Sequence, residues 1–196
     1  YKGSIWAQYT VQRPQVHTAA KEENACEAAV NFWKSLEAEI DIINTGRKKA
    51  FEQLTPKLHA MNSSTDGFME TAFLSFNLRL PNGLSINEVI KMLQYLAVDA
   101  KMVIDTGEPA YQSDKNNPLV RSFLSAIRKN EGQPGFVLKM GTSDMNTVGP
   151  SWNCPIVAYG PGDSSLDHTP NEHLSIQEYR QSIQVLKDVL ETITAS

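Results

Sequence analysis

Cysteine is scarce in this chain, and long apolar runs and basic clusters are missing altogether. Cys26 and Cys154 form no Cys-x-x-Cys pair, so we expect neither a disulfide framework nor a cysteine zinc site, and a reducing cytoplasm is favoured. The net charge of −4 argues against a nucleic-acid partner. No apolar stretch could span a bilayer and no signal segment opens the chain, so we expect no membrane association.

The composition is that of a soluble globular protein. The chain has 196 residues, of which 41 % are hydrophobic and 20 % charged, enough for one ordinary domain or two small ones. The first residue is Tyr1 rather than Met. That leaves open whether the chain is a cleavage product or the ordered part of a longer protein.

The first hundred residues show the periodicities of a βαββαβ unit. The clearest strand spans residues 72–80, where alternate apolar side chains point one way and Asn77 and Arg79 share the opposite face. Asn24 and Glu27 predict a capping box at the start of the first helix. The expected strands are residues 5–11, 50–61, 72–80 and 98–104, with helices from about 24 to 44 and from 85 to 96. This order predicts a ferredoxin-like antiparallel sheet with helices on one face.

The second half has a different character after a polar linker near residues 107–117. We therefore expect one domain over residues 1–107 and another over 108–196. Apolar runs at 136–140 and 155–159 predict buried parallel strands, and Asn117–Pro118 begins a helix. A final capped helix has a predicted core face of Ile176, Ile183, Leu186, Leu190 and Ile193. Two helices and two strands cannot by themselves bury both faces of a parallel sheet. Either further chain completes this domain, or the segment does not form such a sheet.

Two loops that follow the expected strands gather small polar and titratable residues. Because sites form beyond the carboxyl ends of strands, residues 141–144 and 160–168 should converge on one crevice. His168 could be a metal ligand or a general base, or a surface histidine on a solvated loop. A metal-free hydrolase using Ser143 or Ser164 is a further alternative, although no Gly-x-Ser-x-Gly elbow surrounds Ser143.

These loops resemble the carboxy-terminal signature of the M20 metallohydrolases, and most of all the LysW-lysine/ornithine hydrolase branch. The matching segments are Gly141-Thr142-Ser143-Asp144-Met145-Asn146 and Asp167-His168-Thr169-Pro170-Asn171-Glu172-His173. The resemblance covers essentially the whole chain. It implies that residues 1–107 are a lid and dimerisation domain, and that 108–196 are the carboxy-terminal part of an α/β zinc-peptidase-like catalytic domain.

The resemblance also implies roles for individual residues. His168 would be a terminal ligand of one of two zinc ions, for which cobalt could substitute, and Glu172 or Asp167 could orient its ring. His17 would reach across a homodimer and donate to the oxyanion of the tetrahedral intermediate. The residues implied in substrate binding are Asn77, Arg79, Gly141, Thr142 and Ser143.

Two departures from the family pattern concern the metal site and the substrate carboxylate. The family's His-x-Asp motif is absent, and Glu22–Glu23 lies in the wrong context to supply its Glu-Glu pair. We therefore expect the remaining ligands upstream of Tyr1. Lys101 is the only basic residue in the last lid strand, where many relatives have an arginine.

The implied function is release of lysine or ornithine from an N-acyl group in lysine or arginine biosynthesis. The acyl group would be the glutamate of the LysW carrier protein, or the substrate a small N-acyl amino acid, and this chain alone would be inactive. Two alternatives remain open: a dimerisation or ligand-binding module without catalysis, and another M20 deacylase or carboxypeptidase.

Overall fold

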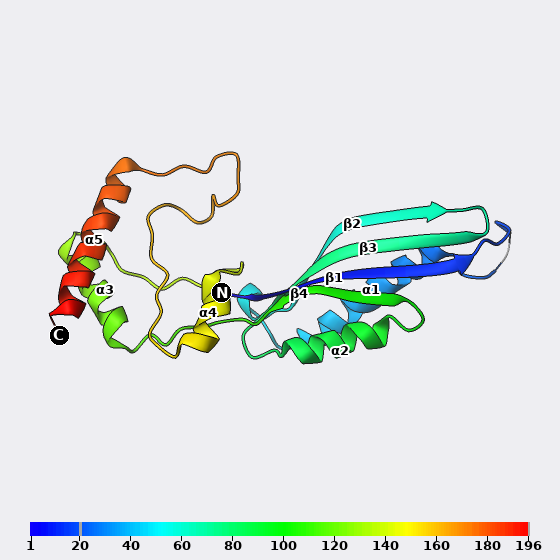
Figure 1. Cartoon of the computed structure of the whole chain (residues 1–196), viewed down its shortest axis with the longest axis horizontal. Coiled ribbons are helices and arrows are strands. Elements are labelled where there is room, and N and C mark those ends of the chain that lie inside the picture. Colours follow the sequence, from blue (N-terminus) through cyan, green and yellow to red (C-terminus); the bar gives the residue numbers. More distant parts are fainter. Residues whose placement is uncertain (20, 196) are drawn as a thin grey trace. The chain divides into compact units, whose positions relative to one another are not determined.

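The computed structural model describes residues 1–19 and 21–195, which form two compact units (Figure 1). The first unit combines Tyr1–Gln112 with Leu138–Pro150, and the second combines Ser113–Val137 with Ser151–Ser196. The return of Leu138–Pro150 to the first unit was not predicted from the sequence. The boundary expected after residue 107 stays a prediction.

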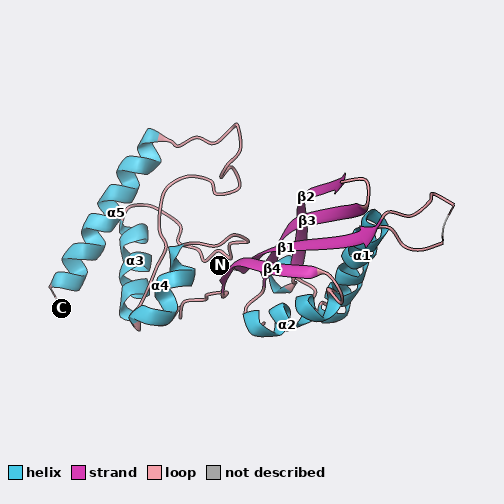
Figure 2. Cartoon of the chain, turned by 45° about the vertical axis from the view of Figure 1, so that its right-hand side comes forward, coloured by secondary structure: helices cyan, strands magenta, loops and turns pink. Residues whose placement is uncertain are grey.

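The first unit is a four-stranded antiparallel sheet with helices on one face (Figure 2). Its strand order is β2-β3-β1-β4. Its main elements are β1 (Gly3–Pro14), α1 (Ala25–Ile43), β2 (Thr55–Thr65), β3 (Met69–Leu80), α2 (Ile86–Leu96) and β4 (Lys101–Glu108). The predicted α+β class and antiparallel sheet are confirmed.

The core of this unit lies between the sheet and its two helices. The inward residues of β3 are at most 1 % exposed, as their alternation predicts: Ala72, Leu74, Phe76, Leu78 and Leu80. The stripe of α1 that covers them is also buried: Ala28, Ala29, Phe32, Leu36 and Ile40. Burying each large apolar side chain contributes about 1.5–3 kcal/mol, so this interface is the main stabilising feature of the unit.

The start of α1 follows the predicted capping box. Asn24 Oδ1 accepts a hydrogen bond from Glu27 N at 2.9 Å, and Glu27 Oε2 accepts one from Asn24 N at 3.0 Å. Each side chain satisfies a backbone N–H that the first turn of a helix leaves without a partner.

The bounds of β2 and β4 differ most from the prediction. Residues 50–52 form a 3₁₀ helix, and β2 runs through Thr65, past the turn expected from residue 62. β4 begins at Lys101 rather than at Val98, because Val98 has a positive φ of 45° in a turn closed by a hydrogen bond from Ala100 N to Ala97 O. Pro56 lies on the edge strand, where its missing N–H is tolerated.

The second unit is built around two helices, α3 (Pro118–Lys129) and α5 (Ile176–Thr194). Both begin as predicted: Asn117 Oδ1 accepts from Val120 N at 2.9 Å, and Ser175 Oγ accepts from Glu178 N at 3.4 Å. Asp188 of α5 accepts hydrogen bonds from Lys129 Nζ at 2.9 Å and Asn130 Nδ2 at 2.7 Å, and the Lys129 bond lowers the pKa of its carboxyl. The two helices therefore pack through a small apolar core, and the hydrogen bonds to Asp188 lie beside it.

The predicted core face of α5 is wrong. The side chains that we expected to be buried are 41–71 % exposed: Ile176, Ile183, Leu186, Leu190 and Ile193. The buried positions are instead Ser182, Val185, Asp188 and Val189. The helical period of α5 was correct, but α3 packs against the neighbouring face of that helix. No other described residue buries the predicted apolar stripe of α5.

The two predicted parallel strands are also wrong. Among residues 1–19 and 21–195, neither 136–140 nor 155–159 belongs to a strand. In the first run Phe136, Val137, Leu138 and Met140 are 45–75 % exposed. A parallel strand needs a neighbouring strand that pairs with it along its length. In the described residues these runs make isolated contacts instead: Lys139 O accepts a hydrogen bond from Lys2 N at 3.1 Å, and Ile156 O accepts one from Ser113 Oγ at 2.6 Å.

A short helix, α4 (Asp144–Trp152), was not predicted, and it contains Gly149 and Pro150, which are unfavourable inside a helix. Gly149 packs against the ring of Tyr111, and a Cβ atom there would overlap the ring. Alanine is favoured over glycine in a helix by about 1 kcal/mol, but overpacking costs about 1–3 kcal/mol.

We therefore expect Gly149→Ala to lower the free energy of unfolding by up to about 2 kcal/mol, measured by urea denaturation. Gly135→Ala is the control, since a Cβ atom at Gly135 would meet no atom within 4 Å. Equal stability of the two variants would contradict the close packing of Gly149 on Tyr111.

Candidate active site

The predicted substrate loop, residues 141–143, is fixed by a buried asparagine that immediately follows it. Asn146 is 1 % exposed, and its Oδ1 accepts a hydrogen bond from Ser143 N at 2.8 Å. Its Nδ2 donates to Lys2 O at 3.0 Å and to Pro109 O at 2.7 Å. Asn146 therefore holds the loop beside the start of β1 and the end of β4. It lies within the quoted signature, but no local pattern reveals contacts so distant in sequence.

Asn77 and Arg79 lie at this same end of the sheet. Arg79 pairs with Ser4, two residues after Lys2, and is partly exposed. Asn77 is 2 % exposed, and its Nδ2 donates to Ser4 Oγ at 2.8 Å and to Ile5 O at 3.0 Å. Since both amide protons are used, Oδ1 is the atom of Asn77 through which it could contact a ligand. The structure thus brings together the predicted substrate residues at one end of the first unit.

A buried lysine, which sequence reasoning missed, supports this end of the sheet. Lys2 is fully buried, and its Nζ donates to Ala50 O at 2.9 Å, Gln53 O at 2.6 Å and Thr55 Oγ1 at 3.1 Å. Burial, and to a lesser extent the positive charge of Arg79, lowers the pKa of Lys2 to about 8. The ammonium group anchors the connection from α1 to β2 against the start of β1.

His17 lies on the exposed loop between β1 and α1. The backbone N of Ala19 donates a hydrogen bond to His17 Nδ1 at 3.2 Å. Because Nδ1 is the acceptor, a neutral ring carries its proton on Nε2. Nε2 of His17 is therefore available as a hydrogen-bond donor.

His17 follows the last residue of β1, whereas Arg79 pairs with Ser4 near the start of that strand. The strand is extended from Gly3 to Pro14. At about 3.3 Å per residue, Ser4 and Pro14 are about 33 Å apart. Within one chain the structure does not bring His17 to Arg79 or to the 141–143 loop.

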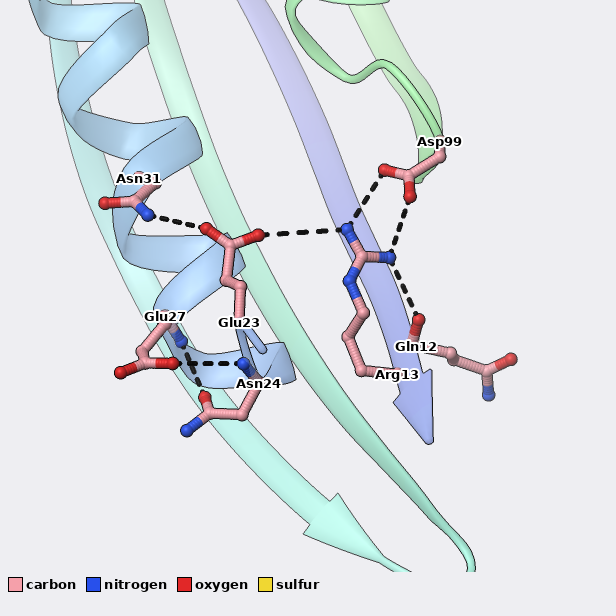
Figure 3. Close-up of polar contacts among 7 residues, drawn as sticks. All are labelled: Gln12, Arg13, Glu23, Asn24, Glu27, Asn31 and Asp99. Carbon is pink, nitrogen blue, oxygen red and sulfur yellow. Dashed lines mark hydrogen bonds and ion pairs between the residues drawn. The ribbon is translucent and has the colours of Figure 1, made fainter. Parts of the chain in front are cut away.

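The base of the His17 loop is held by a set of polar contacts that the sequence does not predict (Figure 3). Arg13 Nη1 and Nη2 lie 2.9 Å and 3.1 Å from the two carboxylate oxygens of Asp99. Arg13 Nη2 also lies 4.0 Å from Glu23 Oε2, and Glu23 Oε1 accepts from Asn31 Nδ2 at 2.6 Å. The hydrogen bonds from Arg13 hold the pKa of Asp99 below its usual value.

His168, the predicted metal ligand, lies on an exposed loop of the second unit with a positive φ of 62°. Glu172 Oε2 accepts a hydrogen bond from the backbone N of His168 at 2.9 Å, so this carboxylate supports the loop backbone. In the described part of the chain, no group of three or more His, Cys, Asp or Glu side chains could hold a metal ion.

Loops 141–144 and 160–168, which we expected to converge, belong to different units, and their convergence stays a prediction.

None of the helices described is long and apolar enough to cross a membrane.

Comparison with known proteins identifies one family over most of the chain. Residues 10–192 match the model of peptidase family M20/M25/M40. The chain is 34 % identical over 195 residues to the [LysW]-lysine hydrolase of Deinococcus radiodurans, covering 97 % of this chain and 54 % of that protein. It is 25 % identical over 178 residues to a [LysW]-lysine/[LysW]-ornithine hydrolase of Saccharolobus islandicus, covering 91 % and 49 %. The chain thus spans about half the length of the curated relatives it matches.

A solved structure has the same fold. The M20 family metallo-carboxypeptidase Sso-CP2 from Sulfolobus solfataricus is similar with a TM-score of 0.73 at 16 % sequence identity. The match covers 97 % of this chain and 58 % of that one.

Proposed function

The chain belongs to peptidase family M20/M25/M40, and from this membership we propose that it forms the lid and the carboxy-terminal catalytic part of a dinuclear zinc amidase. The whole enzyme would be a cytoplasmic homodimer that releases lysine or ornithine from an N-acyl group. The names of the related hydrolases support the LysW carrier protein as the source of that acyl group. The βαββαβ unit would be its ferredoxin-like lid and dimerisation domain.

The geometry of His17 is the observation that carries this proposal. Its ring is exposed, Nδ1 accepts from Ala19 N, and Nε2 is left to donate. An N–H aimed at the developing oxyanion stabilises a tetrahedral transition state. His17 follows Pro14, which lies about 33 Å along β1 from Ser4, the residue that pairs with Arg79. His17 would therefore act in the active site of a second copy.

His168 would hold one of the two zinc ions. An imidazole on an exposed loop suits zinc, and the backbone bond to Glu172 restrains that loop. When bound, two zinc ions supply an activated water and polarise the scissile carbonyl. A single histidine cannot hold two ions, so the remaining ligands would come from the part of the whole enzyme that this chain does not span.

The substrate would lie at the end of the lid where Arg79 and the 141–143 loop meet. Arg79 supplies a bidentate donor for a carboxylate, and the backbone of Gly141, Thr142 and Ser143 would cradle the acyl group. Asn77 Oδ1 can accept a hydrogen bond from a substrate N–H, while Asn77 Nδ2 continues to donate to Ser4 Oγ and Ile5 O.

The test is amide hydrolysis by the whole protein with LysW-lysine, LysW-ornithine and small N-acyl lysine substrates. We expect hydrolysis that a chelator abolishes and zinc restores, and no hydrolysis by residues 1–196 alone. Chelator-resistant turnover would favour a serine hydrolase using Ser143 or Ser164. Zinc-dependent turnover of other acyl groups only would favour another deacylase of the family, and no turnover would favour a binding module.

A further inference from the structure

The His17 loop begins and ends at residues that contact each other. Arg13 is the penultimate residue of β1, and Glu23 immediately precedes Asn24, the N-cap of α1. The Nη2 of Arg13 lies 4.0 Å from Glu23 Oε2. A loop whose two ends are joined by an ion pair has fewer conformations open to it than one with free ends.

Arg13 has two acidic partners, one on each side of the loop base (Figure 3). Glu23 Oε1 accepts from Asn31 Nδ2 at 2.6 Å, which ties Glu23 to α1. Arg13 Nη1 lies 2.9 Å from Asp99 Oδ2, and Arg13 Nη2 donates to Asp99 Oδ1 at 3.1 Å. Bidentate pairing fixes the plane of a guanidinium as well as its distance. The side chain of Arg13 is 22 % exposed, whereas those of Glu23 and Asp99 are 43 % and 60 % exposed. Solvent therefore screens both pairs, and their contribution is to geometry rather than to stability.

Asp99 lies in a strained turn. The preceding residue, Val98, is β-branched, has a φ of 45° and is 86 % exposed. Such a conformation costs on the order of 1–3 kcal/mol and persists only where neighbouring contacts enforce it. The hydrogen bond from Ala100 N to Ala97 O at 2.8 Å and the Arg13–Asp99 pair are those contacts.

A backbone hydrogen bond also holds the start of the loop. Gln15 N donates to Phe68 O at 2.8 Å, which joins the first loop residue to the turn between β2 and β3. Three separate segments of the lid therefore meet around Arg13 and Gln15. Further along the loop, the hydrogen bond from Ala19 N to Nδ1 fixes the orientation of the His17 ring.

We infer that Arg13 is a positioning residue which, through Glu23 and Asp99, fixes the base of the loop so that His17 Nε2 is presented in one orientation to a second copy of the chain. This inference rests on the proposed function, in which His17 acts in trans. Arg13 contacts neither the substrate nor the reacting atoms, so its contribution is to the geometry of His17.

The test is Arg13→Gln in the whole protein, which removes the charge and the bidentate geometry. We expect kcat to fall about 10–100-fold, because a misplacement of about 1 Å of a catalytic group has effects of this size. KM should change less than about twofold, and amide hydrogen exchange should speed up over residues 15–19. Arg13→Lys, which keeps one ion pair, should recover part of kcat, and the swap Arg13→Asp with Asp99→Arg should recover more than either single change.

Gln8→Ala is the matched control. Gln8 lies on the same strand and its Nε2 donates to both carboxylate oxygens of Asp105 on β4, at 3.2 Å and 3.0 Å, away from the loop. We expect wild-type kcat and loop exchange in this variant. Arg13→Gln with wild-type kcat and exchange would overturn the inference, as would a loss of kcat that follows a global loss of thermal stability.

The two proposals can fail separately. If His17→Ala hydrolyses substrate at the wild-type rate, the role of His17 is wrong. Faster exchange over residues 15–19 in Arg13→Gln would still show that Arg13 orders the loop. If His17→Ala is inactive and Arg13→Gln is not, only the positioning role is wrong.

Discussion

Replacing His17 with alanine in the whole protein should lower kcat for amide hydrolysis about 10²–10³-fold, with little change in KM. Loss of one oxyanion donor has an effect of this size because the donor acts on charge that develops only in the transition state. The exposed ring, with Nδ1 accepting from Ala19 N, leaves Nε2 to donate. Steady-state kinetics with a saturating N-acyl lysine substrate measure the change.

His59→Ala is the control for this result. His59 is also an exposed histidine of the first unit. It lies on β2 rather than on the loop, and its ring centroid is 4.4 Å from that of Trp6. We expect this variant to keep nearly wild-type kcat. Equal losses in both variants would indicate a general effect on the first unit, and unchanged kcat in His17→Ala would exclude the oxyanion role.

Replacing His168 with alanine should remove one of two zinc ions per subunit and lower kcat by about 10³-fold or more. A Lewis acid at a reacting carbonyl contributes several kcal/mol, and each 1.36 kcal/mol is a factor of ten in rate. Metal content by atomic absorption and activity over a zinc titration measure the two effects. Folding should be kept, because His168 lies on an exposed loop.

His173→Ala is the matched control on the same loop. Its Nδ1 lies 2.7 Å from the carbonyl oxygen of Asn171, which indicates a local structural role. We expect full zinc content and activity in this variant. Retention of both zinc ions in His168→Ala would remove His168 from the ligand set.

The first unit could be predicted because its signals are local. The alternation of Leu74, Phe76 and Leu78 with polar residues predicts a strand with one buried face, and the Asn24–Glu27 pair predicts a helix start. Both depend on residues a few positions apart, and the sheet satisfies its own backbone. The positions of Asn77 and Arg79 on the outer face followed from the same alternation.

The second unit was predicted less well. Its apolar patterns indicate surfaces that pack against other elements, and the described residues do not cover those surfaces. The stripe with Ile183 and Leu190 is apolar at helical spacing, yet only the neighbouring face with Val185 and Val189 meets α3. Residues 136–140 and 155–159 have the composition of buried strands, but a parallel strand forms only beside a partner. Periodicity predicts which face is apolar, and not what covers it.

The supporting residues of the site could not be predicted for a related reason. Lys2, Asn146 and Arg13 each have at least one partner that is 37 or more residues away in sequence. Nothing in the neighbouring residues distinguishes these from surface polar side chains. The resemblance to the family indicated the residues implied in the chemistry, whereas the structure shows what holds them.

Mixed dimers test most directly whether two copies build each active site together. One subunit would contain His17→Ala and the other His168→Ala, each inactive as a homodimer. We predict that the purified heterodimer regains about half of wild-type activity, because one of its two sites then has both histidines. A heterodimer as inactive as either parent would contradict the shared site.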